Sequence, residues 1–126
     1  MLKSIDHIVL TARDVEKTVE FYSRVLGTQV VKFGDGRYAL QIGAQKINLH
    51  AVGNEFEPKA ASPTPGAIDA CFLTDLTLSE LEERLDHCGL EIELGPVSRT
   101  GAVGPLESVY IRDPDGNLIE IARYPT

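Results

Sequence analysis

The sequence contains few cysteines and no long apolar run, and each shortage excludes a class of protein. Its two cysteines, Cys71 and Cys88, are too few for a disulfide framework and lack CxxC spacing. No apolar stretch approaches the ~20 residues of a membrane span, and the start of the chain lacks the apolar stretch of a secretory signal. We therefore expect reduced thiols and a cytoplasmic protein.

Positive charge is also scarce. The chain has 12 Lys and Arg against 19 Asp and Glu, which gives a net charge of −7. Binding to nucleic acid or to an anionic membrane requires a basic patch, so neither is an expected partner. What is present is ordinary for a globular protein: 43% hydrophobic and 25% charged residues. A chain of 126 residues suits one domain built as a compact pair of modules.

The first half of the chain predicts a strand, a helix and three further strands. Branched aliphatic residues over 5–12 are typical of a strand. A helix should begin after Asp14 and end at Gly27, with apolar residues at helical spacing at Val15, Val19, Tyr22 and Leu26. Three short strands then fit near 28–33, 37–42 and 46–52.

The second half repeats this pattern after a linker. Residues 54–66 hold three prolines and no periodicity, which is typical of a linker. A strand over 67–73 and a helix follow, with Thr77 and Glu80 as a capping box and Gly89 as the stop. Strands are expected near 90–94, 106–112 and 117–123, the last two joined by a turn over 113–116.

Two unrelated features recur at the same offset. The helix-ending glycines Gly27 and Gly89 are 62 positions apart, and so are His7 and Asp69. A shared offset indicates internal duplication. We therefore predict an α+β fold of two βαβββ modules, with module one over 1–53 and module two over 67–126.

Polar side chains occupy strand positions where the pattern is otherwise apolar. Side chains alternate between the two faces of a strand, so His7 shares a face with Ile5 and Val9. The other polar positions, each in the first or last strand of a module, are Asn48, His50, Asp69 and Glu120.

A metal ion is one way to compensate a carboxylate in a half-apolar sheet. Imidazole and carboxylate ligands together suit Zn²⁺, Mn²⁺, Fe²⁺ or Ni²⁺. The alternatives are ordinary: a hydrogen-bonded or exposed histidine, an Asp69 paired with an arginine, an Asn48 bonded to the backbone. No HExxH-like motif decides between them. The residues alone leave a divalent-metal site among these positions as one interpretation beside the ordinary ones.

The two ends of the chain resemble the vicinal oxygen chelate superfamily, which contains glyoxalases, bleomycin resistance proteins and dioxygenases. The resemblance is carried by Asp6–Leu10, 19–22 and 25–27 at the start and by Arg112–Ile121 at the end. Segments 46–50, 55–61 and 95–101 resemble more closely the glyoxalase domain-containing proteins and their bacterial virulence-associated relatives.

The resemblance implies two βαβββ modules that form a curled mixed sheet around a shared cavity, commonly in a homodimer. His7 and Glu120 match the family's His and Glu ligands. Asp69 stands where a second His is usual, and Asn48 stands where lactoylglutathione lyases have a Glu. His50 lies two residues beyond Asn48 on the same face and is a possible substitute. With the resemblance, we predict one divalent-metal site from His7 and Glu120, completed by Asp69 or His50.

The function implied is a metal-dependent, glyoxalase-like lyase or isomerase acting on a small oxygen-chelating substrate, with Glu120 or a neighbouring carboxylate moving the substrate proton. A non-haem iron dioxygenase and a non-catalytic small-molecule (drug) binding protein are the alternatives. Arg99, Tyr110 and Arg112 either face an anionic substrate or lie on the surface. Residues 98–105 form either a flap over the cavity or an ordinary loop.

Overall fold

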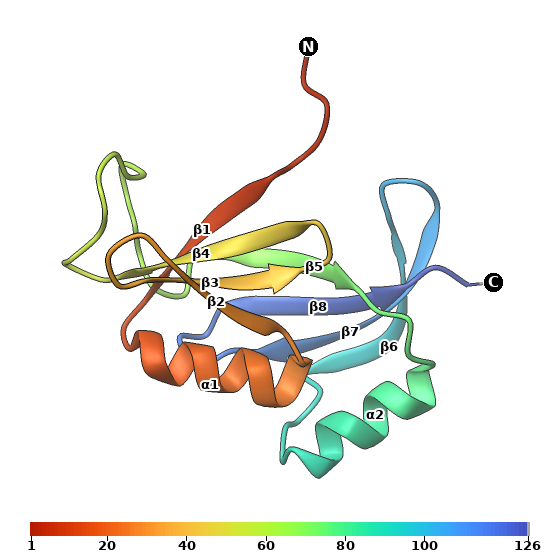
Figure 1. Cartoon of the computed structure of the whole chain (residues 1–126). Helices are drawn as coiled ribbons and strands as arrows, with labels where there is room; N and C mark the ends of the chain where they lie inside the picture. The colour runs from red at the N-terminus through yellow and green to blue at the C-terminus, as the bar shows by residue number, and fades with distance from the viewer. Residues whose placement is uncertain (126) are drawn as a thin grey trace. The chain divides into compact units, whose positions relative to one another are not determined.

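The computed structural model describes residues 1–125 and divides the chain into two compact units, one ending at Ala67 and the other beginning at Ile68. Each unit runs strand, helix and three strands, as the colours of Figure 1 show. The predicted α+β class and the repeated βαβββ order are thereby confirmed. No helix within residues 1–125 is long and apolar enough to cross a membrane.

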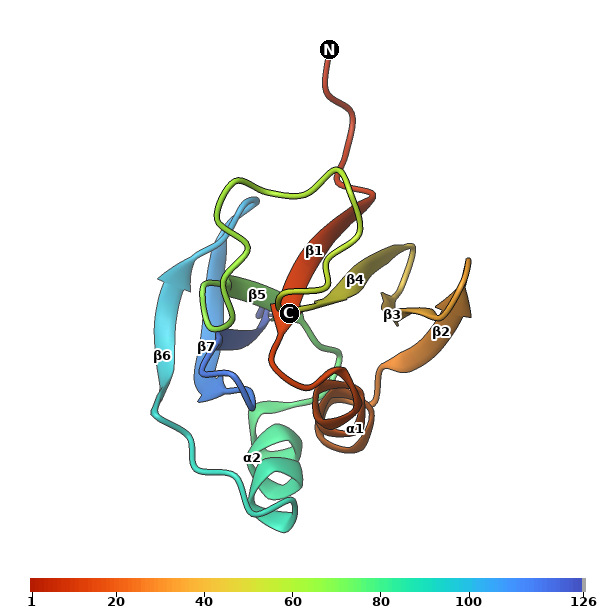
Figure 2. The ribbon, with the colours of Figure 1, turned by 90° about the vertical axis from the view of Figure 1, so that its left-hand side faces the viewer.

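Unit one contains a four-stranded mixed sheet in the order β1-β4-β3-β2 (Figure 2). β1 and β4 are parallel, and the other two pairings are antiparallel. Residues 54–66, the predicted linker, contain no helix or strand. The elements of this unit are β1 (His7–Ala12), α1 (Val15–Leu26), β2 (Gln29–Phe33), β3 (Arg37–Ile42) and β4 (Gln45–Ala51).

The first helix begins and ends at the predicted residues, but a different stripe of it is buried. The Asp14 side chain accepts a hydrogen bond from the backbone N–H of Lys17, and Gly27 ends the helix in the left-handed conformation with φ of 68°. The predicted stripe shares only Tyr22 with the observed one, and the ring of Phe21 packs edge-on against Tyr22. The buried residues are Thr18, Phe21, Tyr22 and Val25.

Unit two contains the corresponding sheet in the order β5-β8-β7-β6, again with its first and last strands parallel. Both hydrogen bonds of the predicted capping box between Thr77 and Glu80 are present. Leu81 and Leu85 bury the apolar face of the helix. The elements are β5 (Asp69–Leu73), α2 (Leu78–His87), β6 (Leu94–Thr100), β7 (Pro105–Arg112) and β8 (Leu118–Arg123).

The strand predicted near 90–94 is wrong, because β6 begins only at Leu94. β6 contains Pro96, whose missing N–H is tolerated because β6 is the edge strand of its sheet. The pairing of β6 with β7 shifts register between Leu94 and Val97, around this proline. Residues 98–100 belong to β6, and a hydrogen bond of 2.7 Å from Gly101 N to Gly104 O closes the turn into β7.

Candidate functional site

The predicted polar positions of unit one lie on a single face of the β1–β4 pair. His7 is opposite Lys46, and His50 is opposite Thr11. Directly opposed residues of parallel strands point to the same side of a sheet, so both histidines share that side. They are nevertheless four positions apart along the pair, which is about 13 Å of strand.

His7 is held by its neighbour in the sequence. Its Nδ1 lies 2.8 Å from Oδ1 of Asp6, and the imidazole remains partly open to solvent. When Nδ1 carries the proton donated to that carboxylate, Nε2 presents its lone pair outward. Metal-binding histidines are commonly oriented by a carboxylate in this manner. Asp6 was not singled out in the sequence, although it directly precedes His7.

Asn48 and His50 are both buried, with exposed fractions of 5% and 3%. Within residues 1–125, Asn48 Oδ1 and His50 Nε2 have no hydrogen-bond partner. The pKa of His50 is lowered, first by burial and then by the positive charge of Arg37. A neutral imidazole with a free nitrogen can accept a hydrogen bond or bind a metal. Buried polar atoms without partners are rare, so these two are candidates for contact with a ligand.

The strand register shows which unit-one residue corresponds to Glu120. In unit two, Glu120 is opposite Cys71. In unit one, Asn48 is opposite Val9, and Val9 and Cys71 differ by the same 62 positions as His7 and Asp69. Asn48 therefore occupies in its unit the position that Glu120 occupies in the other. His50 corresponds by the same register to an alanine, Ala122.

Glu120 in β8 receives hydrogen bonds from two neighbouring strands. The hydroxyl of Ser108 in β7, a fully buried residue, donates a hydrogen bond of 2.6 Å to Glu120 Oε2. From β5, the thiol of Cys71 hydrogen-bonds to the same carboxylate. Burial, and then the negative charge of Glu120, raises the pKa of Cys71 to about 11. The carboxylate is thus held in place, and the thiol stays protonated near neutral pH.

A cavity of about 410 Å³ lies in unit two against this carboxylate. Its volume is within the range of small-molecule sites. The wall combines apolar groups such as Leu106 with polar groups from Cys71, Glu120, Arg99 and Tyr124. The Tyr124 hydroxyl accepts a hydrogen bond of 3.2 Å from the N–H of Val103, in the β6–β7 turn. This turn therefore forms part of the cavity wall.

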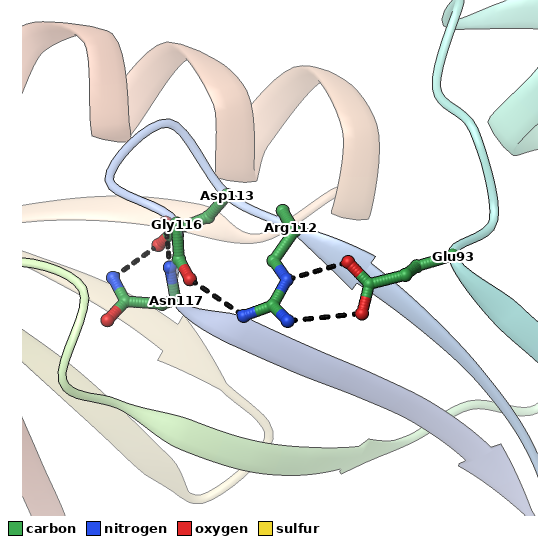
Figure 3. A network of polar contacts seen from close by, with 5 residues as sticks. All are labelled: Glu93, Arg112, Asp113, Gly116 and Asn117. Carbon is green, nitrogen blue, oxygen red and sulfur yellow. Dashed lines mark hydrogen bonds and ion pairs between the residues drawn. The ribbon is translucent and has the colours of Figure 1, made fainter.

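Arg112 was expected either to face an anionic substrate or to lie on the surface, and the structure gives it a structural role (Figure 3). Its Nε and Nη2 lie 2.9 and 3.1 Å from the two carboxylate oxygens of Glu93, and Nη1 donates to the carbonyl of Gly116. The pKa of Arg112 is raised, first by its hydrogen bond with Glu93 and then by the charges of Glu93 and Asp69. A bidentate ion pair of this kind fixes the guanidinium against the β7–β8 turn.

Asn117 connects that turn to β5. Its Nδ2 donates to Asp113 Oδ2 at 2.8 Å, and its Oδ1 accepts from the N–H of Ile68 at 2.8 Å (Figure 3 shows the first of these). Leu118 N then donates to Ile68 O. The fully buried Asn117 thereby fixes the start of β5, and with it Asp69, against the start of β8.

Within residues 1–125, no three His, Cys, Asp or Glu side chains gather around a point where a metal ion could be held. The structure shows how His7 and Glu120 are each oriented within their own units. The ligand set of His7, His50, Asp69 and Glu120 stays a prediction.

The Glyoxalase/Bleomycin resistance protein/Dioxygenase superfamily matches residues 4–121 of the sequence. The chain belongs to this superfamily. Glyoxalase domain-containing protein RDO1 of Mycosarcoma maydis is 52% identical over 123 residues, which are 98% of this chain and 69% of that protein. Virulence protein STM3117 of Salmonella typhimurium is 52% identical over 124 residues, 98% of this chain and 86% of that protein.

The fold agrees with a solved structure of the superfamily. The crystal structure of virulence protein STM3117 superimposes with a TM-score of 0.97 at 51% identity and covers 99% of both chains. More distant members differ in their named chemistry. Catechol-2,3-dioxygenase of Bacillus subtilis is 28% identical over 117 residues, which are 93% of this chain and 40% of that enzyme.

Proposed function

We propose that this member of the superfamily is a metal-dependent, glyoxalase-like lyase or isomerase that acts on a small substrate with two adjacent oxygens. The observation that carries the proposal is the Glu120 carboxylate, which is held by Ser108 at the wall of a cavity of substrate size. A fixed carboxylate facing a cavity can bind a metal or take a proton from a bound carbon acid.

The side chains present suit a divalent ion. His7 is oriented by Asp6, and Glu120 is oriented by Ser108, which are the supporting contacts that metal ligands usually have. With Asp69 or His50 they make a set of imidazole and carboxylate ligands compatible with Zn²⁺, Mn²⁺, Ni²⁺ or Fe²⁺. When bound there, the ion supplies the Lewis acidity that stabilises negative charge on the substrate oxygens.

The chain's own groups have separate roles in this proposal. Glu120 accepts the substrate proton, and Ser108 keeps the carboxylate from rotating away. Cys71 remains a neutral thiol beside it and acts as a hydrogen-bond partner of Glu120.

We further propose that both modules work as one domain. We also propose that the protein is a homodimer, and analytical ultracentrifugation tests this oligomeric state directly.

A second function, a non-haem iron dioxygenase, is favoured by the likeness to a protein named catechol-2,3-dioxygenase. Two histidines and a carboxylate are the ligand set that such chemistry uses. Anaerobic loading with Fe²⁺, followed by oxygen uptake on a panel of catechols, separates it from a lyase. Metal analysis of the purified chain beside a His7→Ala variant separates both enzymes from a non-catalytic binding protein.

The deciding experiment screens the metal-loaded chain against α-hydroxy ketones and thiol adducts of 2-oxoaldehydes, and then measures Glu120→Gln on the substrate found. Removal of a general base typically lowers turnover by about 10²- to 10⁴-fold. Unchanged turnover by a Glu120→Gln variant with intact fold and metal content rules out the proton-transfer role.

A further inference from the structure

The unit-two cavity is lined by one cationic side chain, Arg99, and by the carboxylate of Glu120. Arg99 in β6 is opposite Leu106 in β7, and Tyr110 in β7 is opposite Glu120 in β8. Since Leu106 and Tyr110 are four positions apart on one strand, they share a face. Arg99, Tyr110 and Glu120 thus lie on the same face of the sheet, with Arg99 four positions along β7 from the Tyr110–Glu120 pair.

The guanidinium of Arg99 donates hydrogen bonds to two uncharged groups. Its Nε donates a hydrogen bond of 3.0 Å to the hydroxyl of Tyr110, and its Nη1 donates one of 3.1 Å to the carbonyl of Ser98. The charge also lies 5.5 Å from the centroid of the Tyr110 ring. These contacts orient the group without neutralising it, because none of the partners is negatively charged.

Among residues 1–125, no carboxylate forms an ion pair with Arg99. This contrasts with Arg112 in the neighbouring strand, whose charge is matched by both oxygens of Glu93. A chain with a net charge of −7 offers many possible acidic partners. A guanidinium has five N–H donors in a planar fork, and two of those of Arg99 are used. The other donors can bind an anionic ligand group.

We propose that Arg99 is a specificity-determining residue that binds a carboxylate of the substrate, at the end of the cavity away from the oxygens that react. The planar fork of arginine matches the two oxygens of a carboxylate. The substrate class is therefore a small acid that carries a pair of adjacent oxygens and, in addition, a carboxylate. With that carboxylate on Arg99, the reactive end of the molecule lies toward Glu120. This inference rests on the proposed function for the reaction, although the binding of the carboxylate does not require it.

Equilibrium binding to the whole metal-loaded chain tests this with two matched pairs of probes. Malate and 2-hydroxybutyrate have the same carbon chain and the same hydroxy acid, but only malate has a second carboxylate. Catechol and 3,4-dihydroxybenzoate likewise differ by one carboxylate. Calorimetry should show the carboxylated member binding about 10-fold more tightly in at least one pair, as expected for a charge-assisted hydrogen-bonded pair partly open to water.

The variants assign that preference to Arg99. Arg99→Gln should abolish the preference for the carboxylated probes while leaving the metal content and the affinity for 2-hydroxybutyrate and catechol unchanged. Arg99→Lys should retain part of the preference, since lysine keeps the charge without the planar fork. Tyr110→Phe keeps the ring but removes the acceptor of Nε, so it should reduce the preference. Arg123→Gln removes a positive charge from unit two outside this cavity and should change nothing.

Two results would overturn the proposal: equal binding within both probe pairs, or a preference that Arg99→Gln leaves intact. A chain that fails to bind metal yet still prefers the carboxylated probes through Arg99 would refute the proposed function and retain this site. A chain that binds metal but shows no carboxylate preference would refute the Arg99 site and leave the proposed function standing.

Discussion

Ser108 Oγ in β7 lies 2.6 Å from Glu120 Oε2 in β8, and Ser108 is fully buried. A short hydrogen bond from a neutral donor to a carboxylate fixes one oxygen and leaves the other for a ligand. Glu120 therefore points into the cavity because β7 supplies this donor beside it.

Substitution of Ser108 by alanine should weaken the site without unfolding the sheet. Loss of a residue that orients a metal ligand typically lowers metal affinity or activity by about 10- to 100-fold. Ser108→Thr retains the hydroxyl and is the matched control. Metal titration and circular dichroism of both variants check this, and equal metal affinity and turnover in Ser108→Ala and the unmodified chain would contradict the role.

The Cys71 thiol should react slowly with alkylating agents near neutral pH. Burial and the charge of Glu120 raise its pKa to about 11, so the reactive thiolate is scarce until the pH approaches that value. The alkylation rate should rise steadily between pH 8 and 10, as followed by mass spectrometry with iodoacetamide. Glu120→Gln removes the negative charge and should speed the reaction at pH 8; a slower or unchanged rate there would show that the charge does not act on Cys71.

Gly95→Ala should destabilise unit two strongly. Gly95 has φ of 117°, and a Cβ at this position would lie 2.5 Å from the carbonyl oxygen of Ser108, which is backbone and cannot move aside. Such strain costs of the order of 1–3 kcal/mol. Gly104 is also at positive φ, but the space around an added methyl group is open. The Gly104→Ala variant therefore measures the loss of stability from backbone conformation alone, without a steric clash. Urea unfolding should rank Gly95→Ala as the less stable of the two.

The ion pair of Glu93 with Arg112 should contribute a pH-dependent part of stability. The hydrogen bond from Arg112 lowers the pKa of Glu93 below its ordinary value of 4.5. The folded state then binds fewer protons than the unfolded one, so this contribution is present above about pH 4.5 and is lost as the pH falls through the lower folded pKa. The Glu93→Gln variant should be less stable than the parent at pH 7, and the difference should shrink toward pH 3.

The control for that comparison is Glu91→Gln, since Glu91 is exposed and forms no ion pair among the described residues. Its stability difference from the parent should be small and should not follow the same pH profile. A constant difference between parent and Glu93→Gln across this range would contradict the assignment.

The repeated order of elements was predictable because its signals are local. Asp14, Gly27 and the Thr77 capping box act within a few residues of their helix ends, and all three occur where the sequence placed them. The strand predicted near 90–94 begins only at Leu94, because its bounds are set by pairing with β7, a later part of the chain. No pattern within 90–100 carries that information.

Some of the site residues could likewise be predicted from local patterns, and others could not. Strand alternation placed Asn48, His50 and Glu120 on their faces, but it did not indicate Ser108, which looks like an ordinary small residue in a strand. The turn expected over 113–116 could not have revealed it, because the connection between β7 and β8 is one residue longer and places Arg112 opposite Leu118 and Ser108 opposite Ala122. The ion pair of Arg112 with Glu93 joins residues 19 positions apart, and no local signal announces it.

Metal stoichiometry and affinity test the central claim most directly. The whole chain is freed of metal, titrated with Zn²⁺, Mn²⁺, Ni²⁺ and Fe²⁺, and compared with His7→Ala, Glu120→Ala, Asp69→Ala and His50→Ala. We predict one ion per chain, large losses of metal affinity for His7→Ala and Glu120→Ala, and a comparable loss for either Asp69→Ala or His50→Ala. Binding that is absent, or that survives both His7→Ala and Glu120→Ala unchanged, would contradict it.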